Sequence, residues 1–183
     1  SSVFTIVNLA QHVEQFYLFE DNLTNEEVYD KPISLDFIKL IKQCINNTAK
    51  GSNWKFEMSI DEISIQESIS KKLYISFSER AFKELFNNVV ENAINHGFAD
   101  QKVSYVLRVS LTMVGGVLIF SMLNNGKPLP RGAINKFGIK GESAGETGNR
   151  GLGAWKVKKA IEYYGAEYSI HNQPSQEFTF GWK

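Results

Sequence analysis

The 183-residue chain has 43% hydrophobic residues and a formal net charge of zero. This composition allows one well-buried core, and it lacks the basic footprint of a nucleic-acid binder or a polybasic membrane anchor. The single cysteine, Cys44, excludes an intrachain disulfide and is expected to be a small buried apolar residue. No apolar run of about 18 residues and no signal peptide is present. We therefore expect a cytoplasmic segment without direct membrane contact, whose parent protein can still be membrane-anchored.

The N-terminal residues form a pattern of their own. Apolar residues recur at helical spacing over residues 3–20, which predicts a short helix whose apolar stripe needs a partner helix. Residues 21–30 are acidic and polar without any period, as in a connector. We expect residues 1–30 to be a helix and linker from a longer protein, and residues 31–183 to be the main domain.

Helical spacing and residue alternation predict the elements of the main domain. In chain order these are a helix capped by Ser34 that ends near Gly51, strands at 54–60 and 73–77, a helix from its cap Ser78 through Asn95, a hairpin of 103–113 and 117–123 that turns at Gly115-Gly116, a helix at 152–164 stopped by Gly165, and strands at 166–172 and 177–182. This order favours an α+β fold. We expect a two-layer sandwich of a mixed, mostly antiparallel sheet with helices on one face.

The helix after Ser78 carries a polar stripe rich in asparagine. Asn88 and Asn92 lie one turn apart on one face, and Asn95 follows near the helix end. Asparagine is a mediocre helix former because its amide competes for backbone hydrogen bonds. The stripe is therefore either a solvated face or a site at which amide oxygens bind Mg²⁺, whose other ligands would be water and nucleotide phosphates.

A second candidate site is the glycine-rich start of the later helix. Gly148, Gly151 and Gly153 surround a helix start, where unpaired backbone amides and the helix dipole attract an anion. The preceding long loop adds the positive charges of Lys136, Lys140 and Arg150. This combination suits a triphosphate, and the alternative is a flexible surface loop.

The third candidate is the segment LNNGKPLP, which follows an apolar strand. Asn124 or Asn125 could pair with the edge of a base, because an amide offers both a donor and an acceptor. The alternative is an ordinary turn, since Asn-Gly is a frequent turn dipeptide.

Taken in order, ENAINHG, NNGKPLP, KFGIKGES and NRGLG resemble the successive boxes of the GHKL ATPase superfamily. Over roughly residues 33–183 the chain most resembles the catalytic and ATP-binding domain of bacterial sensor histidine kinases, which has the Bergerat fold. The resemblance implies ATP and Mg²⁺ as cofactors, with Asn92 and Asn88 at the metal. The cofactor-binding residues it implies are Asn88, Asn92, Asn95, Asn124, Gly126, Phe137, Lys140, Arg150, Gly151, Leu152 and Gly153.

The sequence departs from this family pattern at three positions. Asn124 stands where most members have an aspartate that accepts a hydrogen bond from adenine, so the charge-assisted bond is lost. Asn95 stands where many kinases have a lysine near the phosphates, and Pro128 replaces a glycine of the first glycine box. The change at Asn124 predicts weaker affinity or an altered choice of base, and Asn95 removes one positive charge.

The phosphoacceptor is expected to lie outside this chain. His12 lacks the acidic residue that typically follows an acceptor histidine, while His96 and His171 lie in the main domain. The resemblance implies as partners the dimerisation and histidine-phosphotransfer helices of the parent kinase, a homodimer, and a downstream response regulator. One alternative is a degenerate GHKL-fold binding or phosphotransfer scaffold. A serine kinase of the anti-sigma type ranks last, because Asn88 stands where those kinases carry a glutamate.

Overall fold

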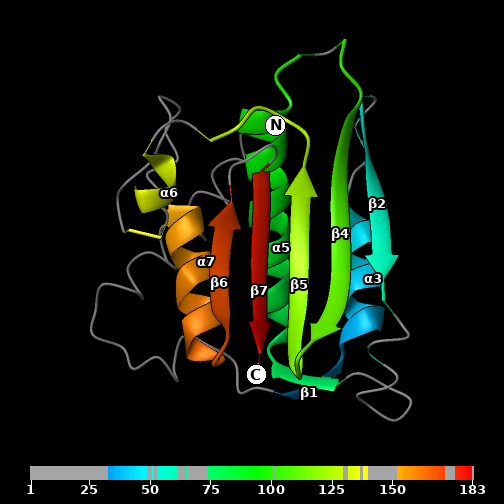
Figure 1. Cartoon of the computed structure of the whole chain (residues 1–183), viewed down its shortest axis with the longest axis vertical. Helices are drawn as coiled ribbons and strands as arrows, with labels where there is room; N and C mark the ends of the chain where they lie inside the picture. Colours follow the sequence, from blue (N-terminus) through cyan, green and yellow to red (C-terminus); the bar gives the residue numbers. More distant parts are fainter. Residues whose placement is uncertain are drawn as a thin grey trace, which may run out of the picture. The chain divides into compact units, whose positions relative to one another are not determined.

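The computed structural model shown in Figure 1 describes residues 33–48, 51, 53–61, 65, 74–100, 102–129, 132–136, 138–139, 152–171 and 176–182. The chain divides into two compact units, Ser1–Lys31 and Pro32–Lys183, and every described residue belongs to the second. The helix expected at residues 3–20 lies outside the described residues. Within the described ranges, every helix is too short or too polar to cross a lipid bilayer.

The main domain alternates helices with strands. In chain order its elements are β1 (Ile33–Asp36), α3 (Phe37–Asn47), β2 (Trp54–Ile60), β3 (Tyr74–Phe77), α5 (Glu79–Asn92), the π-helix η1 (Ala93–Gly97), β4 (Tyr105–Val114), β5 (Val117–Asn124), α6 (Ala133–Lys136), α7 (Leu152–Tyr163), β6 (Glu167–His171) and β7 (Gln176–Trp182).

The larger sheet has five strands in the order β2-β4-β5-β7-β6. Strand β2 runs parallel to β4, whereas the other three neighbouring pairs are antiparallel. Figure 1 shows α3 and α5 behind this sheet. The predicted α+β fold, with a mixed and mostly antiparallel sheet, is confirmed.

Phenylalanine rings join the helices to the sheet in the core. The ring of Phe82 on α5 lies edge-on to Phe37 of α3, with 5.0 Å between centroids, and to Phe120 of β5, with 5.4 Å. All three side chains are fully buried. Cys44 is also buried, as expected, and this burial raises the pKa of its thiol to about 11. A thiol with this pKa is inert at neutral pH.

The start of the domain differs from the sequence prediction. Ser34 does not cap a helix, because it lies in β1, which pairs antiparallel with β3. The cap of α3 is Asp36, whose side chain accepts a hydrogen bond from Lys39 N at 3.2 Å. Serine and aspartate are both good N-caps. The choice between them depends on β3, which lies far along the chain.

Other local predictions are confirmed with small changes. The Oγ of Ser78 accepts a hydrogen bond from Ala81 N at 3.1 Å and so caps α5. The hairpin turns at Gly115 and Gly116, whose φ angles are +57° and +79°. The strand predicted at 54–60 forms as β2, but Met58 on its expected buried face is 45% exposed. β2 is an edge strand and has a neighbouring strand, β4, on one side only.

Candidate functional site

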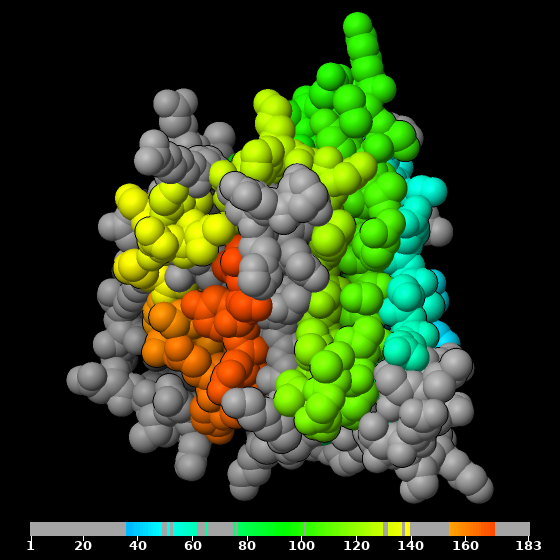
Figure 2. Space-filling view, viewed as in Figure 1, coloured from blue at the N-terminus to red at the C-terminus, as the bar shows by residue number. Residues whose placement is uncertain are grey.

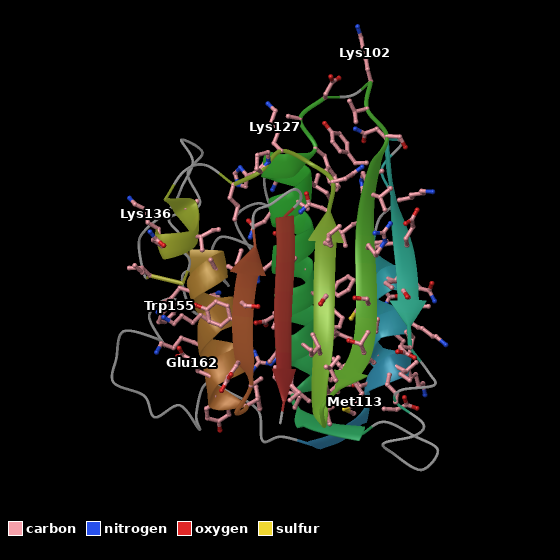
Figure 3. The ribbon with its side chains drawn as sticks, in the orientation of Figure 1. Lys102, Met113, Lys127, Lys136, Trp155 and Glu162 are labelled. Atoms are coloured by element: carbon pink, nitrogen blue, oxygen red, sulfur yellow. The ribbon has the colours of Figure 1, made fainter. Side chains whose placement is uncertain are left out.

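The candidate residues meet at one end of the sheet. Helix α5 runs into η1 at the end where β5 finishes, and Figure 1 shows both at the top of the sheet, with Lys127 marking this end in Figure 3. We call this end the asparagine edge and define it by Asn92, Asn95, Gly97, Asn124 and Gly126.

A close backbone contact joins η1 to the turn after β5. The Lys127 backbone N–H donates a hydrogen bond to the carbonyl oxygen of Gly97 at 2.9 Å. A Cβ on Gly126 would lie only 2.7 Å from that oxygen and 2.8 Å from the Gly97 carbonyl carbon. Backbone atoms cannot move aside cheaply, so the contact requires glycine at position 126.

Asn124 is buried beside this contact. The residue is only 7% exposed, and its Oδ1 accepts a hydrogen bond from Gly126 N at 3.0 Å. The same oxygen lies 3.2 Å from where a Cβ on Gly97 would be. The amide of Asn124 is therefore held at the end of β5 by the turn that follows it.

The neighbouring Asn125 has a different role. It is exposed, and its Oδ1 accepts a hydrogen bond from Val106 N at 2.7 Å, while its own backbone N donates to Val106 O at 3.3 Å. These bonds extend the pairing between β4 and β5 by one residue. Of the two asparagines that the sequence left open, Asn124 is the better candidate for a ligand contact.

The asparagines of α5 form an accessible polar face. Asn92 is exposed and Asn88 is half-buried, with its Nδ2 donating to the backbone oxygen of Glu84 at 2.8 Å. This bond occupies the amide nitrogen of Asn88, so the amide oxygen points away from Glu84 O. Amide oxygens are ligands of the kind that Mg²⁺ takes in proteins. Asn95 is exposed within η1, so the prediction of an asparagine-bearing polar stripe fits the observed helix.

The π-helical end of α5 is a feature that the sequence prediction missed. The backbone N–H of Phe98 donates to Ala93 O at 2.9 Å, which is a bond to the fifth residue back. Such π turns are rare and frequent at functional sites. Apolar spacing gave no signal for this turn, because Ile94 and Phe98 stand four residues apart, as in an ordinary α-helix.

An aromatic cluster supports this turn from behind. Phe98 stacks on Tyr105 with 4.6 Å between ring centroids, and it lies 6.1 Å from Trp54. All three residues are at most 7% exposed. Because Phe98 follows Gly97 directly, this packing holds Gly97 in its contact with the turn after β5.

Helix α7 begins where the glycine-rich motif predicted a helix start. Its first residues are Leu152 and Gly153, and α7 packs against α5. The predicted site residues Phe137, Lys140, Arg150 and Gly151 lie outside the described residues. Whether they join the asparagine edge stays a prediction.

One charged residue between α5 and α7 was not predicted. Lys156 on α7 is half-buried, and burial holds its pKa below the ordinary 10.5, while the opposing charge of Glu84 on α5 partly counteracts this effect. A positive charge therefore lies between the asparagine-bearing helix and α7.

The described residues fit a nucleotide with magnesium better than a metal held by protein alone. Among them, no group of three or more His, Cys, Asp or Glu could hold a metal ion. Mg²⁺ in nucleotide sites takes few protein ligands and keeps water and phosphate oxygens. The amide oxygens of Asn88 and of the exposed Asn92 are ligands of this kind, one helical turn apart.

Comparison with known proteins identifies the family. The family model of the histidine kinase-, DNA gyrase B- and HSP90-like ATPases matches residues 77–183, more than half of the chain. The chain belongs to this family of ATP-binding domains, as its motifs indicated. No curated protein sequence matches the chain.

Solved structures with the same fold include histidine kinases. The nucleotide-free catalytic domain of histidine kinase ThkA has a TM-score of 0.66 and 18% identity, over 84% of this chain and 95% of that one. Acinetobacter baumannii histidine kinase AdeS has a TM-score of 0.65 and 16% identity, over 99% and 79%. The mycobacterial sensor histidine kinase MprB has a TM-score of 0.62 and 14% identity, over 85% and 97%. The chain thus has the fold of histidine kinase catalytic domains.

Proposed function

We propose that this chain is the catalytic domain of a histidine protein kinase. It binds Mg-ATP and supports transfer of the terminal phosphoryl group to a histidine outside the chain, in two-component signal transduction. The observation that carries the proposal is the buried amide of Asn124, held 3.0 Å from Gly126 N beside the close Gly97 contact, in a domain of this ATPase family.

Each end of the site has a separate task. Asn124 contacts the base, and Asn92 with Asn88 supplies amide oxygens near the phosphates. The amino end of α7 receives phosphate oxygens on its unpaired backbone N–H groups. Bound magnesium would supply much of the charge neutralisation that phosphoryl transfer needs, while the protein residues orient the nucleotide.

The proposed partners begin with the histidine that accepts the phosphoryl group. The described histidines are His96, exposed at the end of η1, and His171, in β6. We place the acceptor on dimerisation helices of a homodimeric parent kinase in the cytoplasm, with a response regulator downstream. The test is to supply labelled ATP to a longer protein that includes the upstream helix. Acid-labile label on a histidine is expected, and Mg-ATP binding without any transfer would contradict the kinase activity.

Mg-ATP binding is tested by thermal unfolding of the 183-residue chain. A ligand at 100 times its dissociation constant stabilises by about 2.7 kcal/mol, so a clear rise in Tm is expected with millimolar Mg-ATP. Asn92→Ala should reduce the magnesium-dependent part of this rise. Asn46→Ala, which removes an exposed asparagine from α3, is the matched control and should leave it intact. An unchanged Tm with Mg-ATP would remove the ATP-binding proposal.

A second candidate function is a degenerate scaffold with weak or no ATP binding. It is favoured by the amide at Asn124, which cannot form a charge-assisted bond to a base. The two candidates differ in the Tm experiment, because a scaffold with a degenerate pocket would show no shift. The exposed asparagine face of α5 favours the kinase.

A further inference from the structure

Gly138, just beyond α6, lies directly on the side chain of a residue in α7. Its φ angle is +72°, and it is buried. A Cβ at this position would lie 2.6 Å from Cδ and 3.0 Å from Cβ of Lys158. The Cδ belongs to a flexible chain, but the Lys158 Cβ is fixed by the backbone of α7. A side chain at position 138 would displace the Lys158 side chain and push the segment and the helix apart by a few tenths of an ångström.

The stem of Lys158 is a suitable surface for this contact. Its ammonium group lies 3.9 Å from Glu162 Oε1 in the next turn of α7, and its side chain is 32% exposed. A lysine that directs its charge along its own helix leaves its methylene groups to cover apolar neighbours. Gly138 packs on those methylene groups.

The segment that Gly138 anchors is short and locally closed. Ile139 N donates to Lys136 O at 3.1 Å, which completes the turn around Gly138, and Ala133 at the start of α6 is 7% exposed. In Figure 2 the atoms of this segment, in yellow, abut those of α7, in orange. Figure 3 shows Lys136 pointing outward from the segment, away from the sheet.

The glycine before α6 provides an internal comparison. Gly132 has a φ angle of +82°, but a Cβ there would meet nothing within 4 Å. Both glycines have backbone conformations that favour glycine. At Gly138 a side chain would also collide with Lys158, whereas at Gly132 it would not. Of these two glycines, Gly138 is therefore the one that makes a close contact with another segment.

We propose that Gly138 and Lys158 form a seat that fixes the α6 segment on α7 and thereby maintains nucleotide affinity. This inference rests on the proposed function. The segment follows Asn124, which contacts the base in that proposal, and the seat lies on the helix whose amino end receives the phosphates. The segment belongs to the connection between these two ends of the site, so its contact with α7 would fix part of that connection, and Gly138 is a positioning residue that touches no ligand.

The test compares Gly138→Ala with Gly132→Ala in titrations of the 183-residue chain with Mg-ADP. Both variants carry the strain of a positive φ, whereas only Gly138→Ala meets Lys158. If the seated state is the binding-competent one, lowering its population raises the apparent dissociation constant in proportion. We expect a rise of about fivefold or more for Gly138→Ala beyond that of Gly132→Ala.

A rescue variant separates the seat from a general folding defect. Lys158→Ala removes Cδ and Cγ, two of the three atoms that a Cβ at position 138 would meet, and keeps the Cβ contact at 3.0 Å. Gly138→Ala combined with Lys158→Ala should therefore recover most, but not all, of the affinity lost relative to Gly132→Ala. The Tm without nucleotide should be similar for Gly138→Ala and Gly132→Ala. Equal affinities for these two, absence of rescue, or a loss of Tm that accounts for the weaker binding would overturn the seat. Failure of the unmodified chain to bind Mg-ADP would instead remove the proposed function, and the seat with it.

Discussion

The carbonyl oxygen of Gly97 accepts a hydrogen bond from Lys127 N at 2.9 Å, which joins the π-helical end of α5 to the turn after β5. These residues are far apart in the chain, and one lies beside each half of the proposed site. The bond couples the helix that carries Asn88 and Asn92 to the strand that ends at Asn124. Four predictions test the elements around it.

Gly126→Ala should disrupt the site. Its Cβ would lie 2.7 Å from Gly97 O, and overpacking of this kind costs about 1–3 kcal/mol. Urea unfolding should show that loss, and nucleotide titration should show weaker binding. Lys127→Ala keeps the backbone N–H and adds no atom, so it should stay within about 0.5 kcal/mol of the unmodified protein. Equal stability of the two variants would contradict the packing argument.

Asn124→Asp should tighten binding of adenine nucleotides. A carboxylate can accept from Gly126 N with one oxygen and from the adenine amino group with the other, as a charge-assisted bond. Calorimetric titration with ADP should give a dissociation constant several-fold lower, on the order of 1 kcal/mol. Asn125→Asp, in which an oxygen can still accept from Val106 N, is the control and should leave affinity unchanged. No change for Asn124→Asp would mean that Asn124 does not contact the base.

Lys156→Met should raise stability at neutral pH. The pKa of Lys156 is held below 10.5 by burial, so the unfolded chain binds this proton more tightly than the folded one. Stability of the unmodified protein therefore rises as pH increases through the lowered folded pKa toward 10.5. The advantage of Lys156→Met in Tm should be largest at pH 7 and shrink towards pH 10. Lys159→Met removes a lysine from an exposed position of the same helix and is the control for the loss of a charge.

Ser78→Ala should lower stability without changing the site. Ser78 is 2% exposed and its Oγ caps α5, and loss of an N-cap typically costs about 1 kcal/mol. The cap lies at the opposite end of α5 from Asn92, so the dissociation constant for Mg-ADP should stay within about twofold at temperatures where both proteins are folded. Ser78→Asp keeps an acceptor and should restore part of the cap. A large loss of affinity in Ser78→Ala would show that the two ends of α5 are coupled.

Local patterns were sufficient for most elements of this domain. Alternation predicted β2 and the β4–β5 hairpin, and the turn at Gly115-Gly116 has the positive φ angles that the pattern required. The cap at Ser78 and the asparagine face of α5 were also predicted, because capping and helical periodicity depend on residues within one or two turns. The motifs identified the family because each of them is a short run of neighbouring residues that can be recognised without the fold.

Tertiary structure decided the features that depend on distant residues. Ser34 lies in β1 because β1 pairs antiparallel with β3, and Asp36 is therefore the cap of α3. The sequence could not distinguish the roles of Asn124 and Asn125. The structure does, because Val106 N of β4 donates a hydrogen bond to Asn125 Oδ1. Gly126 contacts Gly97, and Gly138 contacts Lys158. In each pair the two segments approach so closely that a Cβ on the glycine would lie less than 3.0 Å from an atom of the other segment. A sequence pattern specifies which residues can form a helix or strand, whereas the distance between two such elements is set by the packing of the whole domain.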